Sequence, residues 1–445
     1  EFNYEGDILT LNGLDNSFDP EGDELTFVWT QIDGEQGVQI NYLDNSTISF
    51  IVPKPEDLEN LTLELELEVY DSYGEETSNT DNISITINSL YKSNSINIIE
   101  GQSLYSLSVI PDDRSVSSVF EDLVPLGAHK VIGEGTSTFW NEGLNLWMGN
   151  LTNIDPRHGY WIYGLDNLDG EDDVIGSMEH VGIPIDCSLE YDFDYGANLF
   201  SYGGNADVVA ISDAISQDEY PEFYECNGTK SIIGNAQAAF WSSAIGEWMG
   251  SLDELRRDKG YWITTCSEFT LNWSCDEGES SRLAEEAKEI EMYPEGFKYS
   301  QSSQQAFYFI EDARVNGQEL NEDAWIIAYN NNVIAGARQW NGAYTDVPFM
   351  GYDNSTRTAG YAQHGDVPTF NVDYPSTGEL VEMDAEGHSE WTSGLTTMSV
   401  INLTDKFLPT EVSLSNAYPN PFNPVTMLTY DVPSDMLISM GVYDV

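Results

Sequence analysis

The sequence is poor in basic residues. It holds 16 Lys and Arg against 77 Asp and Glu, which gives a formal net charge of −61 at pH 7. A negative field of this strength repels phosphate backbones and anionic membrane surfaces. We therefore expect neither nucleic acid nor an acidic lipid surface among the partners. Salt or bound cations must screen the repulsion between the protein's own charges.

Cysteine is also scarce. Only four cysteines occur, and no two of them form a Cys-x-x-Cys pair, so a zinc site of the usual spacing is excluded. Two disulfides in an oxidising compartment fit their clustering better than buried thiols do, although three connectivities are possible. The four candidates are Cys187, Cys226, Cys266 and Cys275.

Long apolar runs and catalytic signatures are missing as well. No run of about 18 apolar residues is present, so we predict no membrane span. There is no Gly-x-Ser-x-Gly, no His-Glu-x-x-His and no phosphate-binding glycine loop. The 5 histidines are scattered, and pairs of acids are expected by chance in so acidic a chain. We expect no catalytic residues here, although a catalytic domain upstream in a longer precursor would be compatible with this.

What the sequence does contain is a strand pattern. The whole chain is 40% hydrophobic and 12% aromatic, which is enough for a folded core. At 61–70 the run LTLELELEVY alternates Leu with Glu or Thr, and clusters of Asp, Asn and Gly separate such runs. We predict an all-β protein of serial, immunoglobulin-like β-sandwich domains, with one short helical or linker segment near 280–292.

The sequence also contains an internal duplication. The segments 132–162 and 233–263 share a pattern of Gly, Phe-Trp, Trp-Met-Gly and Gly-Tyr-Trp without a gap, so each shared residue recurs at one constant offset. Trp140, Trp147 and Trp161 recur in this way as Trp241, Trp248 and Trp262. The pattern loosely resembles non-catalytic modules of large secreted bacterial proteins that end in Gly-Tyr-Trp.

Three further segments resemble known modules. The stretches NSFDPEGDELTFVWTQ, FIVP and LEVYDSYGEE resemble a PKD-type immunoglobulin-like domain, and ELNEDAWIIAYNNNVIAGARQW resembles a β-sandwich that often precedes secretion signals. The motif YPNPFNP resembles the opening of a type IX secretion sorting domain, which usually continues with several more strands and a basic tail. Its residues are Tyr418, Pro419, Asn420, Pro421, Phe422, Asn423 and Pro424.

These patterns predict six segments. They are a PKD-like sandwich at 1–91, repeat copies at 92–181 and 182–277, an acidic linker or helix at 278–299, a β-sandwich at 300–404 and an incomplete sorting domain at 405–445.

Acidic loops suggest a structural Ca²⁺ ion, because this cation prefers six to eight oxygen ligands. The segment 15–23 is crowded with carboxylates, and Asp71, after the strand pattern at 61–70, could approach it. A simple turn at Pro20 and Gly22 is the alternative. These candidate ligands are Asp15, Asp19, Glu21, Asp23 and Asp71. A second acidic cluster lacks the spacing of an EF-hand and yields no ligand assignment; it comprises Asp166, Asp169, Glu171, Asp172 and Asp173.

The repeated tryptophans suggest glycan binding by stacking, although a shared hydrophobic core is the commoner reason for such recurrence. Trp147 and Trp248 are the best stacking candidates, because each lies before Met-Gly in a glycine-rich context.

Together these features favour a non-catalytic, secreted protein of the extracellular cell surface, structural or adhesive. It would be a stalk, surface layer or filament subunit that the type IX secretion machinery exports. The alternative is the accessory C-terminal region of a large secreted hydrolase, with spacer or glycan-binding modules. If the chain self-associates into filaments, we expect strand addition near 405–445, where an incomplete module would expose an unpaired edge.

Overall fold

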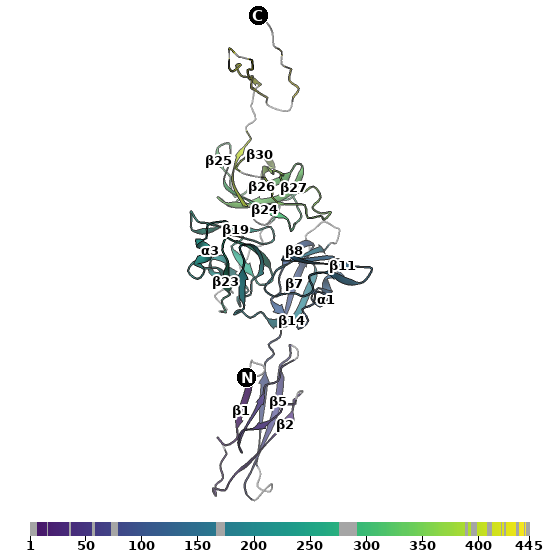
Figure 1. The fold of residues 1–445 in the computed structure, drawn as a ribbon, viewed down its shortest axis with the longest axis vertical. Coiled ribbons are helices and arrows are strands. Elements are labelled where there is room, and N and C mark those ends of the chain that lie inside the picture. The colour runs from purple at the N-terminus through teal and green to yellow at the C-terminus, as the bar shows by residue number, and fades with distance from the viewer. Residues whose placement is uncertain are drawn as a thin grey trace. The chain divides into compact units, whose positions relative to one another are not determined.

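The protein consists of two compact units whose regular secondary structure is almost wholly β-strand (Figure 1), which confirms the predicted all-β class. The first unit comprises Glu1–Asn235, Ser243–Trp248 and Leu252–Lys288; the second comprises Ala236–Ser242, Met249–Ser251 and Glu289–Val445. The structure, a computed structural model, describes residues 7–15, 17–34, 37–55, 58–72, 79–165, 174–275, 292–387, 390–392, 398–406, 412–419, 421, 424–432, 436–439 and 441. All but the last residue of the predicted helix or linker at 280–292 therefore lies outside the described residues.

The N-terminal module packs two three-stranded sheets, in the orders β1-β4-β3 and β2-β5-β6, around one core. In β5 the alternating leucines of the sequence all face the core, as a strand with one buried side requires. They are Leu61, Leu63, Leu65 and Leu67. Each fully buried leucine contributes roughly 1.5–3 kcal/mol. The strands are β1 (Ile8–Asn12), β2 (Thr26–Asp33), β3 (Asn41–Tyr42), β4 (Thr47–Ile51), β5 (Leu61–Tyr70) and β6 (Asn79–Ile87).

Copy 1 of the repeat, which we define as β7 to β14, has a five-stranded sheet in the order β12-β11-β10-β13-β8 and a three-stranded sheet in the order β7-β14-β9. Its core contains Phe120, Tyr160 and Met178. The elements are β7 (Lys92–Ile99), β8 (Gly101–Tyr105), β9 (Val109–Ile110), α1 (Val116–Val119), the 3₁₀ turn η2 (Glu121–Leu123), β10 (Lys130–Gly133), β11 (Thr136–Asn141), β12 (Leu146–Gly149), β13 (Tyr160–Leu165) and β14 (Val174–Pro184).

Copy 2, which we define as β15 to β23, contributes to the first unit the run β16-β22-β18 and the pairs β15-β23 and β17-β21. The disulfide Cys226–Cys266 lies within it, and the disulfide Cys187–Cys275 joins the residues that flank its two ends. The elements are β15 (Glu190–Phe193), β16 (Gly196–Ser201), β17 (Val208–Ala210), α2 (Ile211–Ala214), α3 (Pro221–Glu225), β18 (Ser231–Ile233), β19 (Ala238–Ser242), β20 (Glu247–Gly250), β21 (Glu254–Arg256), β22 (Gly260–Thr265) and β23 (Phe269–Asn272).

The second unit is built on an eight-stranded sheet in the order β25-β24-β31-β30-β29-β26-β27, with β28 also paired to β24. In this sheet the backbones of β27 and β28 approach closely at Gly336, where a Cβ would lie 1.7 Å from the carbonyl oxygen of Pro348. Its strands are β24 (Gln305–Val315), β25 (Gln318–Glu319), β26 (Trp325–Asn330), β27 (Val333–Gln339), β28 (Thr345–Met350), β29 (Thr369–Tyr374), β30 (Glu379–Glu386) and β31 (Met398–Asp405).

A buried charge pair lies inside this second unit. Arg338 and Asp346 are 4% and 1% exposed, with 3.4 Å between Nη2 and Oδ2. The same carboxylate accepts hydrogen bonds from the backbone N–H of Ala238 and the hydroxyl of Ser251. These donors satisfy the oxygen, as burial of a charge requires. Ala238 and Ser251, from the segments Ala236–Ser242 and Met249–Ser251, thus contribute to the polar core of the second unit.

Near the C-terminus two short strands, β32 (Ser413–Leu414) and β33 (Tyr430–Asp431), pair with each other. Tyr418 and Met427 exchange two backbone hydrogen bonds, and the hydroxyl of Thr426 donates to the carbonyl of Pro419. The peptide bond between Tyr418 and Pro419 is cis.

Candidate functional site

A groove in copy 1 is the best candidate for a binding site. It has a volume of about 810 Å³ and lies between the helical segment α1–η2 and the hairpin β11–β12. Both tryptophans of the hairpin line it, together with carboxylates and hydroxyl groups. The lining residues used below are Asp113, Ser117, Glu121, Thr138, Trp140 and Trp147.

The hairpin brings the two tryptophans together because Trp140 of β11 and Trp147 of β12 are directly paired in the register. Paired residues of an antiparallel hairpin project from the same face, so the indoles meet edge to face at 5.6 Å between centroids. On the core side, the ring of Phe120 meets Trp147 edge to face, with 6.4 Å between the ring centroids. The indole N–H of Trp147 is buried and has no hydrogen-bond partner among the residues that the structure describes.

The polar side of the groove comes from the segment that carries α1. The hydroxyl of Ser115 accepts a hydrogen bond from the N–H of Ser118 and thereby caps the helix. The backbone N–H of Ser115 donates to Asp113 and lowers the pKa of that carboxyl, so it is ionised at neutral pH. Asp113 and Glu121 therefore give the groove a negative rim.

The equivalent tryptophan of copy 2, Trp248, is half-buried like Trp147 but has different partners. The ring of Phe223 stacks on Trp248 at 6.1 Å with 24° between the planes. The indole N–H of Trp248 donates to the hydroxyl of Tyr224 at 3.2 Å. Trp248 therefore has both a ring stacked on it and a partner for its nitrogen, whereas the nitrogen of Trp147 has no partner within the described ranges.

A length difference explains this contrast. Helix α2 begins at Ile211, 95 residues after the start of α1 at Val116, whereas the tryptophans recur after 101 residues. Copy 2 thus has six more residues between its first helix and its hairpin. The longer connection contains α3, which carries Phe223 and Tyr224. Sequence analysis missed these residues, although the two unequal offsets could have revealed the insertion.

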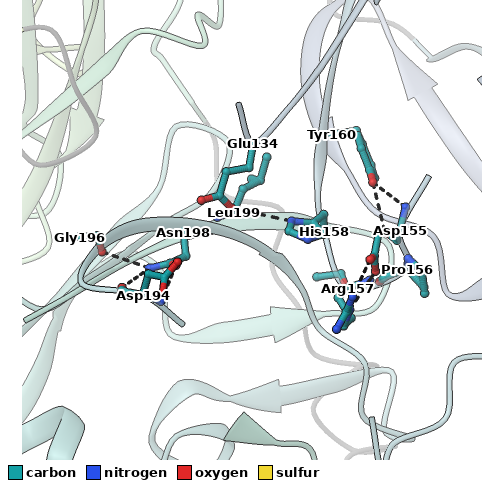
Figure 2. Close-up of polar contacts among 11 residues, drawn as sticks. Glu134, Asp155, Pro156, Arg157, His158, Tyr160, Asp194, Gly196, Asn198 and Leu199 are labelled. Carbon is teal, nitrogen blue, oxygen red and sulfur yellow. Dashed lines mark hydrogen bonds and ion pairs between the residues drawn. The ribbon is translucent and has the colours of Figure 1, made fainter. Parts of the chain in front are cut away.

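A second polar site joins copy 1 to copy 2. In Figure 2, Glu134 of copy 1 accepts a hydrogen bond from the backbone N–H of Leu199 in copy 2 at 2.9 Å. The reciprocal bond runs from the N–H of Leu104 to Asn235, also at 2.9 Å. Nδ1 of His158 lies 3.8 Å from the Glu134 carboxylate.

Equivalent serines repeat this reciprocity. The N–H of Ser201 donates to the carbonyl oxygen of Arg157 at 2.9 Å. Its hydroxyl donates to the carbonyl oxygen of Pro156 at 2.6 Å. Ser106 makes the matching bonds to Asp258 at 3.2 Å and to Arg257 at 3.0 Å. Equivalent groups contacting each other in both directions define an isologous, pseudo-two-fold interface.

The glycines of the two Gly-Tyr-Trp motifs meet at the centre of this interface. A Cβ on Gly159 would lie 2.7 Å from the Cα of Gly260, and a Cβ on Gly260 would lie 2.8 Å from the Cα of Gly159. Both positions therefore require glycine for the close approach of two backbones. Beside them Leu104, Trp161 and Leu199 form a small buried cluster.

The four candidate cysteines are all brought together in pairs. Of the three connectivities that the sequence allowed, the structure joins Cys187 to Cys275 and Cys226 to Cys266, with Cα separations of 5.3 and 5.6 Å. The first bond ties the two ends of copy 2 together, and the second anchors the residue after α3 to the residue after β22.

The acidic loop of the N-terminal module is organised by turns. The Oδ1 of Asp19 accepts hydrogen bonds from the N–H groups of Glu21 and Asp23, and Asp15 pairs with Asn12. Within the described ranges, no three His, Cys, Asp or Glu side chains, Asp71 included, are gathered as a metal site. Calcium binding here stays a prediction.

Two other sets of predicted residues are described only in part or not at all. The second acidic cluster, Asp166, Asp169, Glu171, Asp172 and Asp173, lies outside the described residues. Of the sorting motif, Asn420, Phe422 and Asn423 also lie outside them.

Among the helices described, none is long and apolar enough to cross a membrane.

No protein-family model and no curated protein sequence matches this chain. Among solved structures, the Bacillus anthracis TIE protein aligns with 86% of this chain and 68% of its own at 10% identity and a TM-score of 0.13. A similarity this low carries no inference about fold or function.

Proposed function

We propose that this protein is a non-catalytic, extracellular surface protein with a structural or adhesive role, exported by type IX secretion. The observation that carries the proposal is the reciprocal interface between the two repeat copies. It makes a block of two modules held by matched hydrogen bonds at Ser106 and Ser201 and by the close approach of Gly159 and Gly260. Such a block can hold an exposed surface in a fixed position, as a structural protein requires, whereas catalytic cycles commonly depend on loops or lids that move.

The disulfides support an extracellular setting. Cross-links of this kind persist in oxidising compartments and are rare in the reducing cytosol. Both bonds close long loops, with sequence separations of 88 and 40 between the partners, so both constrain the unfolded chain strongly. The large negative charge keeps such a protein soluble and suits a saline exterior.

The export route rests on the resemblance of the Tyr418–Pro424 motif to a type IX sorting domain. The test is a chromosomal deletion from residue 412 onward in the bacterium that encodes the chain, followed by labelling of intact cells. We expect the surface signal to disappear and the protein to accumulate inside the envelope. A surface signal equal to that of the undeleted strain would refute the export proposal.

The adhesive role has its own test, which compares attachment of the undeleted strain and a strain without the gene to its natural surfaces. Loss of attachment supports adhesion, and unchanged attachment contradicts it. A recognisable hydrolase domain in the same open reading frame would instead favour the alternative role as an accessory region.

Self-association is part of the structural proposal. The short pair β32–β33 presents few paired backbone groups, so strand addition between subunits is expected in this part of the chain. An assembled structure in which residues 412–432 contact no neighbouring subunit would refute it.

A further inference from the structure

We propose that the groove of copy 1 binds a neutral oligosaccharide against Trp147 and Trp140, and that copy 2 has lost this site because Phe223 fills it. The inference deepens the adhesive role proposed above and rests on it. It is carried by the contrast between two copies of one module within the same chain.

The first step is the chemistry of the groove. Ligand sites are concave, typically 300–1,000 Å³, and combine aromatic walls with a few polar groups. The groove in copy 1 has about 810 Å³, two tryptophans on one wall and Ser117, Glu121 and Thr138 among its polar lining. Indole faces suit the apolar face of a sugar ring, and hydroxyls and carboxylates suit its hydroxyl groups.

The second step is the occupied counterpart. In copy 2 a six-membered ring, that of Phe223, already lies nearly parallel to the indole of Trp248. The hydroxyl of Tyr224 accepts from the indole nitrogen. Copy 2 thus shows that the tryptophan at this repeat position accepts a ring on its face and a hydroxyl at its nitrogen.

Among the described residues, the ring contacts of Trp147 are edge-to-face ones with Trp140 and Phe120, and no ring lies parallel to it as Phe223 does to Trp248. The nitrogen of Trp147 is buried and finds no acceptor in the described part of the chain, and leaving a buried donor unpaired costs about 1–3 kcal/mol. A ligand that brings a saturated ring and a hydroxyl oxygen supplies what Phe223 and Tyr224 supply to Trp248. Because the nitrogen is covered in the free groove, the hydrogen bond requires a small rotation of the indole on binding.

The third step is the charge of the ligand. The groove has carboxylates at Asp113 and Glu121 on its rim, in a chain of net charge −61. Sulfated and uronic-acid-rich glycans are therefore repelled. A neutral oligosaccharide keeps the stacking and the hydrogen bonds to the carboxylates without this repulsion.

The test uses the whole chain on an array of neutral and acidic oligosaccharides, followed by calorimetric titration of the neutral glycans bound. The decisive variant is Ser117→Phe, which fills the groove from an exposed position of α1 without removing a core side chain. Its matched control is Ser212→Phe at the equivalent exposed position of α2. A second variant, Trp147→Leu, removes the stacking face.

We expect Ser117→Phe and Trp147→Leu to weaken neutral-glycan binding at least tenfold and Ser212→Phe to leave it unchanged. Melting midpoints of all variants verify folding. The proposal is overturned if no neutral glycan binds, if only acidic glycans bind, or if Ser117→Phe binds as the unaltered protein does. The attachment and surface-labelling results are separate measurements, so a surface adhesin that binds no glycan refutes this inference alone.

Discussion

Replacing Gly159 by Ala should destabilise the paired repeat copies. The new methyl carbon would lie 2.7 Å from the Cα of Gly260 and 3.3 Å from the carbonyl oxygen of Phe200, and both neighbours are backbone atoms that cannot rotate away. Overpacking of this kind typically costs about 1–3 kcal/mol. For a cooperative block of this size, each kcal/mol lowers the melting midpoint by roughly 2–4 °C.

The assay is differential scanning calorimetry of the whole chain, with Gly260→Ala as the reciprocal variant. Its methyl would lie 2.8 Å from the Cα of Gly159, so we expect a loss of similar size. The control is Gly143→Ala in the β11–β12 loop, where the nearest atom within 4 Å is the side-chain oxygen of Asn141 at 3.4 Å. If Gly159→Ala melts at the same temperature as Gly143→Ala, the two glycines do not meet and the pseudo-two-fold interface is refuted.

Three further perturbations test other parts of the molecule. Burial lowers the pKa of His180, and Asp122 opposes this only in part. The free energy of unfolding should therefore be highest above the ordinary imidazole pKa and fall as the pH drops below it. His180→Gln should flatten this fall in a series of melts between pH 5 and 8. Replacing Cys226 and Cys266 together by Ser opens a loop of 40 residues and should cost about 4 kcal/mol by the chain-entropy estimate, measured by denaturant unfolding; a loss below about 1 kcal/mol would contradict the cross-link. If the acidic loop at 15–23 holds a structural Ca²⁺ ion, a chelator must lower the melting midpoint of the N-terminal module, and an unchanged midpoint would rule the ion out.

Local pattern accounts for much of the fold. The alternation of Leu and Glu in 61–70 predicts a strand with one buried face, and β5 has that face in the core. The run of asparagines at 330–332 predicts a hairpin turn, and Asn331 adopts the positive φ of 55° that such a turn needs. These features depend on near neighbours in the chain, which is why a single sequence suffices to predict them.

The candidate site depends on contacts between distant residues. The recurrence of Trp147 as Trp248 is plain in the sequence, but their different surroundings are not, because Phe223 reaches Trp248 from a helix 25 residues earlier in the chain. Likewise, the cysteines are visible in the sequence, and their pairing is not.

The sequence by itself determined the all-β class, the duplication and the acidity, because each follows from composition or from short-range period. Only the tertiary structure decided which tryptophan lines an open groove, which cysteines are joined, and why the Gly-Tyr-Trp motifs begin with glycine. The physical reason is the same in each case. Whether a ring is covered, a thiol has a partner or a methyl has room depends on which backbone approaches it, and in this protein that backbone belongs to a segment dozens of residues away.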